Sequence, residues 1–237
     1  MNTSFLPCWS MFPEAFALED KRVHIWRATR DVSPVRLKDL EALLSSDEKN
    51  RAYRFHFSED KNRFIAHRAL LRLLLSRYLG VEPLELRFSY NPQGKPLLEN
   101  TSRAPICFNL SHSQELALYA FTMGREVGVD IEALRLVPDA EKIAERYFTG
   151  EEAQRLREAP SHLKNEIFLQ LWTAKEAFIK ALGMGLSMPL NQFEAAHVPG
   201  WSLYPFVPAP GFTAALAVKE DEYHFDFFDG DRLVEIK

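Results

Sequence analysis

Cysteine is scarce in this chain, and long hydrophobic runs are missing. Only two cysteines, Cys8 and Cys107, occur in 237 residues. They are too few for a disulfide scaffold or a structural zinc site, so a reducing compartment is expected. No run of about 18 apolar residues is present, and the N-terminus lacks a basic segment followed by an apolar one. The sequence therefore predicts a cytoplasmic protein that is neither secreted nor inserted in a membrane.

An excess of basic charge is also missing. The 29 Lys and Arg residues are outnumbered by 33 Asp and Glu residues, which gives a net charge of −4. General nucleic-acid binders depend on a basic surface that neutralises phosphates. The composition therefore predicts that nucleic acid is not a partner.

Two common catalytic loops are absent. The segment Asn91-Pro92-Gln93-Gly94-Lys95-Pro96 is not a P-loop, because Pro96 stands where Ser or Thr is required and no glycine lies five residues before Gly94. Ser111 and His112 are adjacent, but the Gly-x-Ser-x-Gly elbow of the α/β-hydrolases is missing. The sequence thus indicates neither a nucleotide-type glycine loop nor a hydrolase nucleophile.

A pair of carboxylates shares one face of an expected strand. In Gly128-Val129-Asp130-Ile131-Glu132, a period of two directs Asp130 and Glu132 to one side and the apolar residues to the other. Like charges on a partly buried strand repel each other and lose hydration. The pair is compatible with a structural role or with a metal site. Oxygen ligands without nearby Cys or His clusters suit Mg²⁺.

The segment 172–180, Trp-Thr-Ala-Lys-Glu-Ala-Phe-Ile-Lys, has the periodicity of a helix. Trp172, Glu176 and Lys180 recur every four residues and lie on one side. Taken alone, such a Glu–Lys pair is ordinary chemistry of a solvated helix face.

Two segments could face a phosphate. The cluster Phe108-Asn109-Leu110-Ser111-His112-Ser113 lies between two apolar runs, so its polar side chains belong to a strand end. The Gly and Pro residues of 91–96 are typical of a turn that presents Lys95.

In this order along the chain, G-K-P, F-N-L-S-H-S, G-V-D-I-E and W-x-x-K-E-A-F-x-K resemble the signature set of the Sfp-type 4′-phosphopantetheinyl transferases. The charged stretch 44–78 also resembles the N-terminal half of that family. The resemblance implies an enzyme that transfers the phosphopantetheine arm of coenzyme A to a serine of an apo acyl or peptidyl carrier protein. The other product would be adenosine 3′,5′-bisphosphate.

The resemblance also implies the roles of the acidic residues and of the lysine on the helix. Asp130, Glu132 and Glu176 would hold Mg²⁺ beside the pyrophosphate. Lys180 would contact the same phosphates, and Glu176 would also be the general base for the carrier serine.

For coenzyme A, Ser111 and His112 match the phosphate-binding positions of the family, and Gly94, Lys95 and Pro96 match its adenine and phosphate loop. Arg51 and Arg63, with Arg68 as a weaker match, would contact the 3′-phosphate. These arginines alternate with acids, so a solvated helix face is the alternative interpretation.

The fold implied is α+β, with two pseudo-symmetric lobes in which helices pack on a small, mainly antiparallel sheet. We expect an N-terminal lobe of residues 1–122, a C-terminal lobe of residues 123–237 and an active site in the cleft between them, in a monomer. Periodicity predicts helices and strands in the following segments. The helices are 37–44, 61–78, 140–147, 150–158 and 164–182; the strands are 23–29, 84–89, 106–110, 116–121, 127–131, 201–207, 213–218 and 223–228.

The carrier proteins of this family are usually acidic, so a locally basic or apolar docking surface is expected, with Arg146, Tyr147 and Phe148 as possible contributors. Two alternatives remain: a non-catalytic module that binds coenzyme A or a carrier protein, and a different Mg²⁺-dependent phosphoryl or nucleotidyl transferase. The motifs do not specify the carrier protein or the pathway.

Overall fold

The computed structural model describes residues 5–13, 15–29, 33–99, 105–185, 188–219 and 222–234. The strands are β1 (Arg22–Thr29), β2 (Phe88–Tyr90), β3 (Pro96–Leu98), β4 (Ile106–Ser113), β5 (Leu116–Met123), β6 (Val127–Ala133), β7 (Trp201–Phe206), β8 (Phe212–Lys219) and β9 (His224–Asp229). The helices are α1 (Pro34–Ala42), α2 (Ser46–Ala52), α3 (Ser58–Leu79), α4 (Ala140–Tyr147), α5 (Gly150–Glu158) and α6 (Lys164–Leu182). None of the helices described is long and apolar enough to cross a bilayer.

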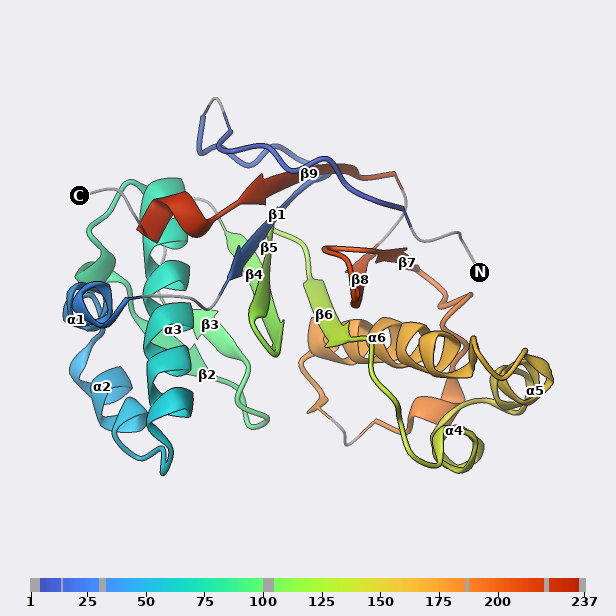
Figure 1. The fold of residues 1–237 in the computed structure, drawn as a ribbon. Helices are drawn as coiled ribbons and strands as arrows, with labels where there is room; N and C mark the ends of the chain where they lie inside the picture. The colour runs from blue at the N-terminus through green and yellow to red at the C-terminus, as the bar shows by residue number, and fades with distance from the viewer. Residues whose placement is uncertain are drawn as a thin grey trace.

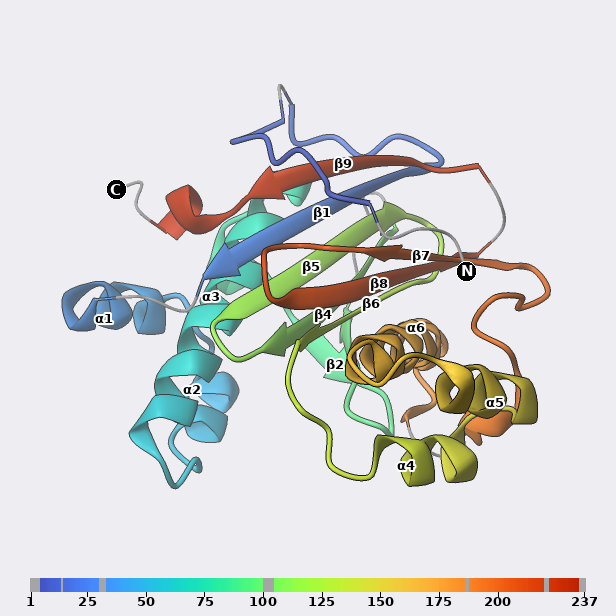
Figure 2. The ribbon, with the colours of Figure 1, turned by 45° about the vertical axis from the view of Figure 1, so that its right-hand side comes forward.

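The strands form two larger sheets and a hairpin. The first sheet has the order β4-β5-β1-β9, the second has the order β6-β8-β7, and β2 pairs with β3. All pairs are antiparallel except β1 with β9, which are parallel. The fold class is therefore α+β with mainly antiparallel sheets, as expected (Figures 1 and 2).

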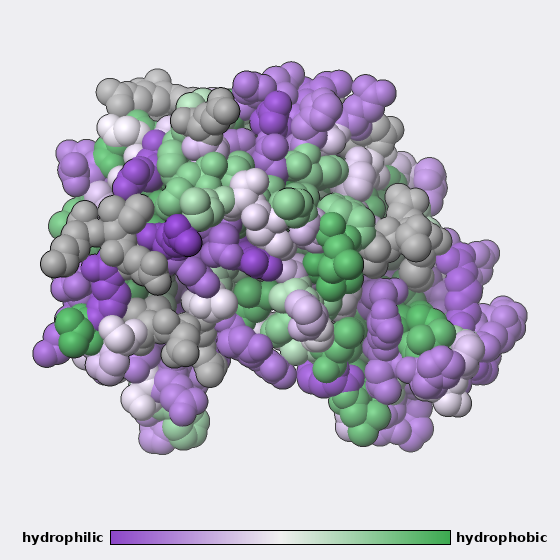
Figure 3. All heavy atoms as spheres, turned by 45° about the horizontal axis from the view of Figure 1, so that its top comes forward, coloured by the Kyte–Doolittle hydropathy of each residue, from purple (hydrophilic) through white to green (hydrophobic). Residues whose placement is uncertain are grey.

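The two sheets pack face to face between two long helices. On β5, Leu116 and Leu118 face the second sheet, whereas Tyr119 and Phe121 face α3. This alternation follows from the period of two in a strand. Because of it, β5 contributes apolar side chains both to the core between the two sheets and to the core between the first sheet and α3. Helix α6 covers the opposite face of the second sheet. On the face shown in Figure 3, hydrophilic and hydrophobic residues are interspersed, and a gap at the lower edge separates the two ends of the molecule.

Helix α6 lies unusually close to β6 at Gly128. A Cβ atom at this position would lie 1.9 Å from the carbonyl oxygen of Ala177 and 2.5 Å from the backbone nitrogen of Ala181. Only glycine permits this contact, because any other side chain would push the helix away. The close approach brings Asp130 of β6 next to Lys180 of α6.

Most predicted elements are present, and several details differ. The strand expected at 84–89 is wrong, because Pro83–Glu85 forms a 3₁₀ turn and β2 begins only at Phe88. Proline at the first position of this turn presets its backbone, which the apolar pattern did not reveal. The short elements α2 and β3 were not predicted, and α1 and α3 begin three residues earlier than expected.

Strand β9 comes from the predicted C-terminal lobe but completes the first sheet. It pairs with β1 from Arg22 opposite His224 to Arg27 opposite Asp229. The segment near Ser10 adds to it, because the Ser10 carbonyl accepts from the Asp229 amide at 2.8 Å. The division into two lobes between residues 122 and 123 stays a prediction. With that division, β9 belongs to the C-terminal lobe by sequence but to the first sheet by its pairing.

A buried histidine joins β1, α3 and β9. His24 is 3% exposed, and its Nδ1 lies 2.8 Å from the Tyr78 hydroxyl, which accepts from Trp26 Nε1 at 2.9 Å. Burial lowers the pKa of His24 from 6.5 to about 4, against the opposing effect of Asp226. The folded protein therefore keeps this ring neutral.

This histidine predicts a loss of stability in mild acid. The unfolded chain binds a proton at His24 below pH 6.5, whereas the folded chain resists protonation down to about pH 4. The free energy of unfolding should therefore fall by about 3 kcal/mol as the pH drops through this window. Urea unfolding at several pH values measures it, and a His24→Asn variant should lose this part of the pH dependence. An unchanged slope in the variant would assign the effect to other groups.

Candidate active site

A cleft of about 380 Å³ opens between α3, the β2–β3 hairpin, the end of β4 and α6. Many of the predicted site residues line it, although they lie far apart in the sequence: Arg51, Arg68, Gly94, Lys95, Pro96, His112, Glu176 and Lys180. The structure therefore brings the G-K-P turn, the S-H pair and the α6 motif to one place.

Of the three predicted cation ligands, Glu176 lines this cleft, whereas Asp130 and Glu132 of β6 do not; Asp130 is connected to it through Lys180, which does. Asp130 Oδ1 accepts from Lys180 Nζ at 2.5 Å and from Ser111 Oγ at 2.8 Å, and Ser111 Oγ itself accepts from Lys180 Nζ at 2.8 Å. Glu132, two residues further along β6, accepts from Ser113 Oγ at 3.2 Å. Ser111 is buried and contacts Asp130 and Lys180, so it supports the acidic group directly.

Glu176 is one helical turn before Lys180 and is half-buried. Within the described residues its carboxylate makes no side-chain hydrogen bond or ion pair. Burial is the main cause that raises the pKa of Glu176, and the negative charge of Asp130 is the second. The charge of Glu132 also raises this pKa, whereas the charge of Lys180 lowers it. Burial and Asp130 likewise raise the pKa of Glu132. The three carboxylates are thus close enough to repel one another.

This donor set fits a hard divalent cation. It consists of three carboxylates without sulfur or imidazole ligands, and a cation would relieve the repulsion that raises the pKa values of Glu132 and Glu176. In the part of the chain that the structure describes, no three His, Cys, Asp or Glu side chains already have the arrangement of a metal site. The Asp130 carboxylate instead forms an ion pair with the Lys180 ammonium.

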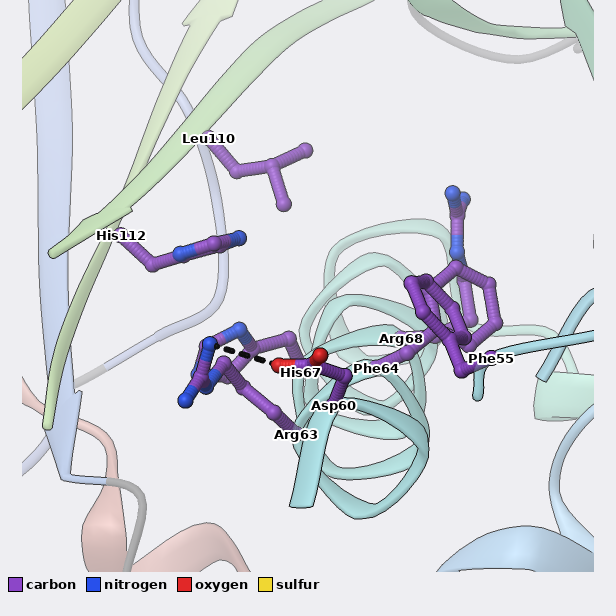
Figure 4. A pocket seen from close by; sticks show the side chains of 8 residues that line it. All are labelled: Phe55, Asp60, Arg63, Phe64, His67, Arg68, Leu110 and His112. Atoms are coloured by element: carbon purple, nitrogen blue, oxygen red, sulfur yellow. Dashed lines mark hydrogen bonds and ion pairs between the residues drawn. The ribbon is translucent and has the colours of Figure 1, made fainter. Parts of the chain in front are cut away.

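A smaller pocket of about 140 Å³ adjoins the cleft between α3 and β4. Figure 4 shows Leu110 and His112 of β4 facing Arg63, His67 and Asp60 of α3 across it. Arg63 Nη1 donates to Asp60 at 3.2 Å. Arg63 Nε and Arg68 Nη1 are buried and have no hydrogen-bond partner in the described part of the chain. Buried guanidinium groups with unused donors favour an anion.

His112 lines both the cleft and the smaller pocket, so it lies where the two adjoin. Burial, Arg63 and Lys180 lower the pKa of His112. The ring is therefore neutral near pH 7 in the free protein. His112 is thus not a cation that is ready to bind phosphate before the ligand arrives.

Lys95 has a more structural position than the sequence suggested. Its ammonium donates to the carbonyl oxygens of Lys180 at 2.7 Å and Ala181 at 2.8 Å, and Asn91 donates to the Gly183 carbonyl at 2.7 Å. These bonds attach the hairpin to the C-terminal end of α6, where unpaired carbonyls favour cations. Burial lowers the pKa of Lys95.

Arg51 is exposed and lies at the rim of the cleft. Its guanidinium stacks over Phe64 and Tyr90, with distances to the ring centroids of 5.4 Å and 5.6 Å. Arg68 stacks on the same two rings and is buried, so the alternative of a solvated helix face does not describe Arg68.

Sequence reasoning missed an ion pair behind the site. Lys175 is 0% exposed, and its ammonium lies 2.8 Å from Glu152 of α5 while also donating to the Leu190 and Phe193 carbonyls. Glu152 accepts from the amides of Thr149 and Ala195. A lysine inside an otherwise amphipathic helix motif was the only signal available.

The segment considered for docking a carrier protein is partly exposed. Tyr147 is 39% exposed and packs edge-on against Trp172, and Arg146 stacks over the Tyr147 ring at 5.3 Å. Phe148 is buried against Phe168, so it supports this surface from within and is not available for contact with a partner.

Comparison with known proteins agrees with this geometry. Residues 126–227 match the model of the 4′-phosphopantetheinyl transferase superfamily, and residues 26–123 match that of the 4′-phosphopantetheinyl transferase N-terminal region. The chain is 41% identical to the 4′-phosphopantetheinyl transferase HetI of Nostoc sp. over 89% of its length and 93% of that protein.

Other relatives carry the same name. The chain is 33% identical to the 4′-phosphopantetheinyl transferase Sfp of Bacillus subtilis over 64% of its length and 66% of that protein. It is 31% identical to a phosphopantetheinyl transferase of Thraustochytrium sp. over 76% of its length and 64% of that protein. Together with the site, these similarities show that the chain belongs to the 4′-phosphopantetheinyl transferase superfamily and is an enzyme of the Sfp type.

Proposed function

We propose that this enzyme transfers the 4′-phosphopantetheine arm of coenzyme A to a serine hydroxyl of an apo acyl or peptidyl carrier protein and releases adenosine 3′,5′-bisphosphate. The observation that carries the proposal is that the cleft is lined by Glu176 and Lys180 and adjoins the pocket that holds the unused guanidinium donors of Arg63 and Arg68. Such a cleft suits a ligand with separated phosphate groups that meets its acceptor at the acidic end.

Arg63, Arg68 and His112 are the proposed ligands of the 3′-phosphate end. Their support is the pocket that they line together and the two unused buried donors, Arg63 Nε and Arg68 Nη1. Because His112 is neutral in the free protein, a bound phosphate would favour its protonation. Arg51, Gly94, Lys95 and Pro96 form the adjacent wall.

Asp130, Glu132 and Glu176 are the residues that would hold Mg²⁺. When bound, the cation would neutralise charge on the pyrophosphate during the displacement. Lys180 supplies a further positive charge at the same place, and its bonds to Asp130 and Ser111 fix its direction. The serine oxygen attacks the β-phosphorus, and the bond from that phosphorus to the bridging oxygen breaks.

Glu176 is the proposed acceptor of the serine proton. Its raised pKa makes the carboxylate a better base than an exposed glutamate, and no bond to a described residue blocks it. Direct transfer and transfer through a water molecule both fit this role. Cytoplasmic location and Mg²⁺ dependence belong to this proposal as well.

Mass spectrometry of a carrier protein tests the proposal. The purified enzyme is incubated with coenzyme A, Mg²⁺ and an apo carrier, and the carrier serine should gain one phosphopantetheine group. A protein that binds coenzyme A but modifies none of a panel of apo carriers would instead support the non-catalytic binding module. A panel is needed because the physiological carrier is unknown.

A binding measurement tests the 3′-phosphate assignment. Replacing Arg63 by Gln should weaken coenzyme A binding about 10- to 100-fold, because a charged hydrogen bond to phosphate contributes about 1.5–3 kcal/mol. Binding of dephospho-coenzyme A, which lacks that phosphate, should hardly change. Calorimetry with both ligands measures the difference, and Arg54→Gln, an exposed position outside the pocket, is the control. Equal losses for both ligands would contradict the assignment.

A further inference from the structure

Strands β4 and β6 belong to different sheets, and side chains connect them. Neither sheet pairs the two strands. Asn109 Oδ1 accepts from the Val129 amide at 2.9 Å, and Ser111 Oγ donates to Asp130 at 2.8 Å. These contacts lie two residues apart on β4, so they point to the same side.

Ser113 makes the next contact in this series. Its Oγ accepts from the Ala133 amide at 3.1 Å and donates to Glu132 Oε2 at 3.2 Å. A hydroxyl has one proton, so accepting the amide hydrogen directs that proton toward the carboxylate. The position of Ser113 is itself determined by the hairpin with β5, where it pairs with Leu116.

Little else in the described structure holds Glu132. The guanidinium of Arg135 lies 3.7 Å away on a side chain that is 53% exposed, which is a weak restraint. Thr213 lies directly opposite Glu132 on β8, but its buried hydroxyl has no hydrogen-bond partner among the described residues. Asp130 repels the Glu132 carboxylate. Without Ser113, this side chain would be free to turn toward solvent.

We propose that Ser113 is a positioning residue that holds the Glu132 carboxylate in place for the divalent cation and thereby links β4 to the cation-binding side of the cleft. The inference rests on the proposed function, because it needs Glu132 to be a cation ligand. Groups that orient metal ligands by hydrogen bonds typically change metal affinity 10- to 100-fold when they are removed.

A Ser113→Ala variant is the central test. The Mg²⁺ affinity of the coenzyme A-bound enzyme, measured by calorimetry and by the Mg²⁺-induced rise in Tm, should fall about 10-fold. Coenzyme A affinity without Mg²⁺ should stay the same. At saturating Mg²⁺ the kcat should approach that of the wild type, whereas the Mg²⁺ concentration for half-maximal rate should rise.

Two variants serve as matched controls. Ser113→Thr keeps the hydroxyl and should restore Mg²⁺ affinity. Thr213→Val removes a buried hydroxyl from the residue that pairs with Glu132 on β8, and this hydroxyl makes no hydrogen bond to a described residue, so Mg²⁺ affinity should not change and Tm should be equal or higher. If the alanine variant does not fold, Ser113→Cys replaces it, because a thiol is a similar but weaker donor.

The outcomes separate this inference from the proposed function. Wild-type Mg²⁺ affinity in Ser113→Ala, or an equal loss in Thr213→Val, would overturn the role of Ser113. Asp130→Ala provides the reference: if it abolishes Mg²⁺ binding while Ser113→Ala does not change it, the cation site stands and the positioning role fails. If Asp130→Ala binds Mg²⁺ normally, the cation site and the inference fail together.

Discussion

Replacing Glu176 by glutamine should lower kcat about 10²- to 10⁴-fold, the range expected for loss of a general base. Glutamine keeps the shape of the side chain but could not accept the serine proton, and it would be a weaker ligand for the proposed cation. Coenzyme A should still bind, because the guanidinium pocket lies at the other end of the cleft. Single-turnover kinetics with an apo carrier and calorimetry with coenzyme A measure the two effects separately.

The control for this variant is Glu166→Gln on the same helix. Glu166 is exposed in the first turn of α6, and among the described residues its carboxylate accepts a hydrogen bond from Gln170 alone, at 3.1 Å, so its replacement should leave kcat within about twofold. Retained turnover in Glu176→Gln would remove both the base and the third-ligand assignment. A loss of coenzyme A binding equal to the loss of kcat would point to a collapsed cleft.

Replacing Glu152 by glutamine should destabilise the protein by about 3–5 kcal/mol, the cost of leaving one member of a buried ion pair without its partner. Lys175 is fully buried, and the two carbonyls that remain to it carry no net charge. Burial already lowers the pKa of Lys175, so the variant would favour a neutral amine. Urea unfolding monitored by tryptophan fluorescence measures the loss.

An exposed pair on the same side of the molecule provides the comparison. Glu145 accepts from Arg157 at 2.8 Å, with side chains that are 53% and 56% exposed. Because solvent screens such pairs, Glu145→Gln should change the free energy of unfolding by less than about 1 kcal/mol. Equal effects of the two variants would mean that the Lys175–Glu152 pair contributes no more than a surface contact.

Local patterns predicted the elements that carry the site. The alternation of Val127, Val129 and Ile131 with Asp130 and Glu132 predicted β6, and the observed strand buries the apolar residues between the sheets. The helical repeat of segment 164–182 predicted α6, and Gly183, with φ of 68°, ends it. Both predictions succeeded because side-chain direction in a strand or helix follows directly from backbone geometry.

The same patterns failed where neighbours far along the chain decide. Segment 84–89 is apolar enough for a strand, but the carbonyls of Pro83 in the 3₁₀ turn and of Leu86 just after it accept from the buried Arg72, and β2 is confined to three residues. Strand β9 was expected, yet its parallel pairing with β1 was not. A strand pattern shows which face is apolar and does not show which partner covers it.

The sequence by itself determined the chemical groups and their order: the G-K-P turn, the serine and histidine at the end of β4, the acidic pair on β6 and the glutamate and lysine of α6. Only the tertiary structure decided how they meet. It joined β4 to β6 through Asn109, Ser111 and Ser113, and it buried Lys175 against Glu152. The physical reason is that each element follows from local backbone geometry, whereas these contacts depend on the packing of segments about 20 or more residues apart.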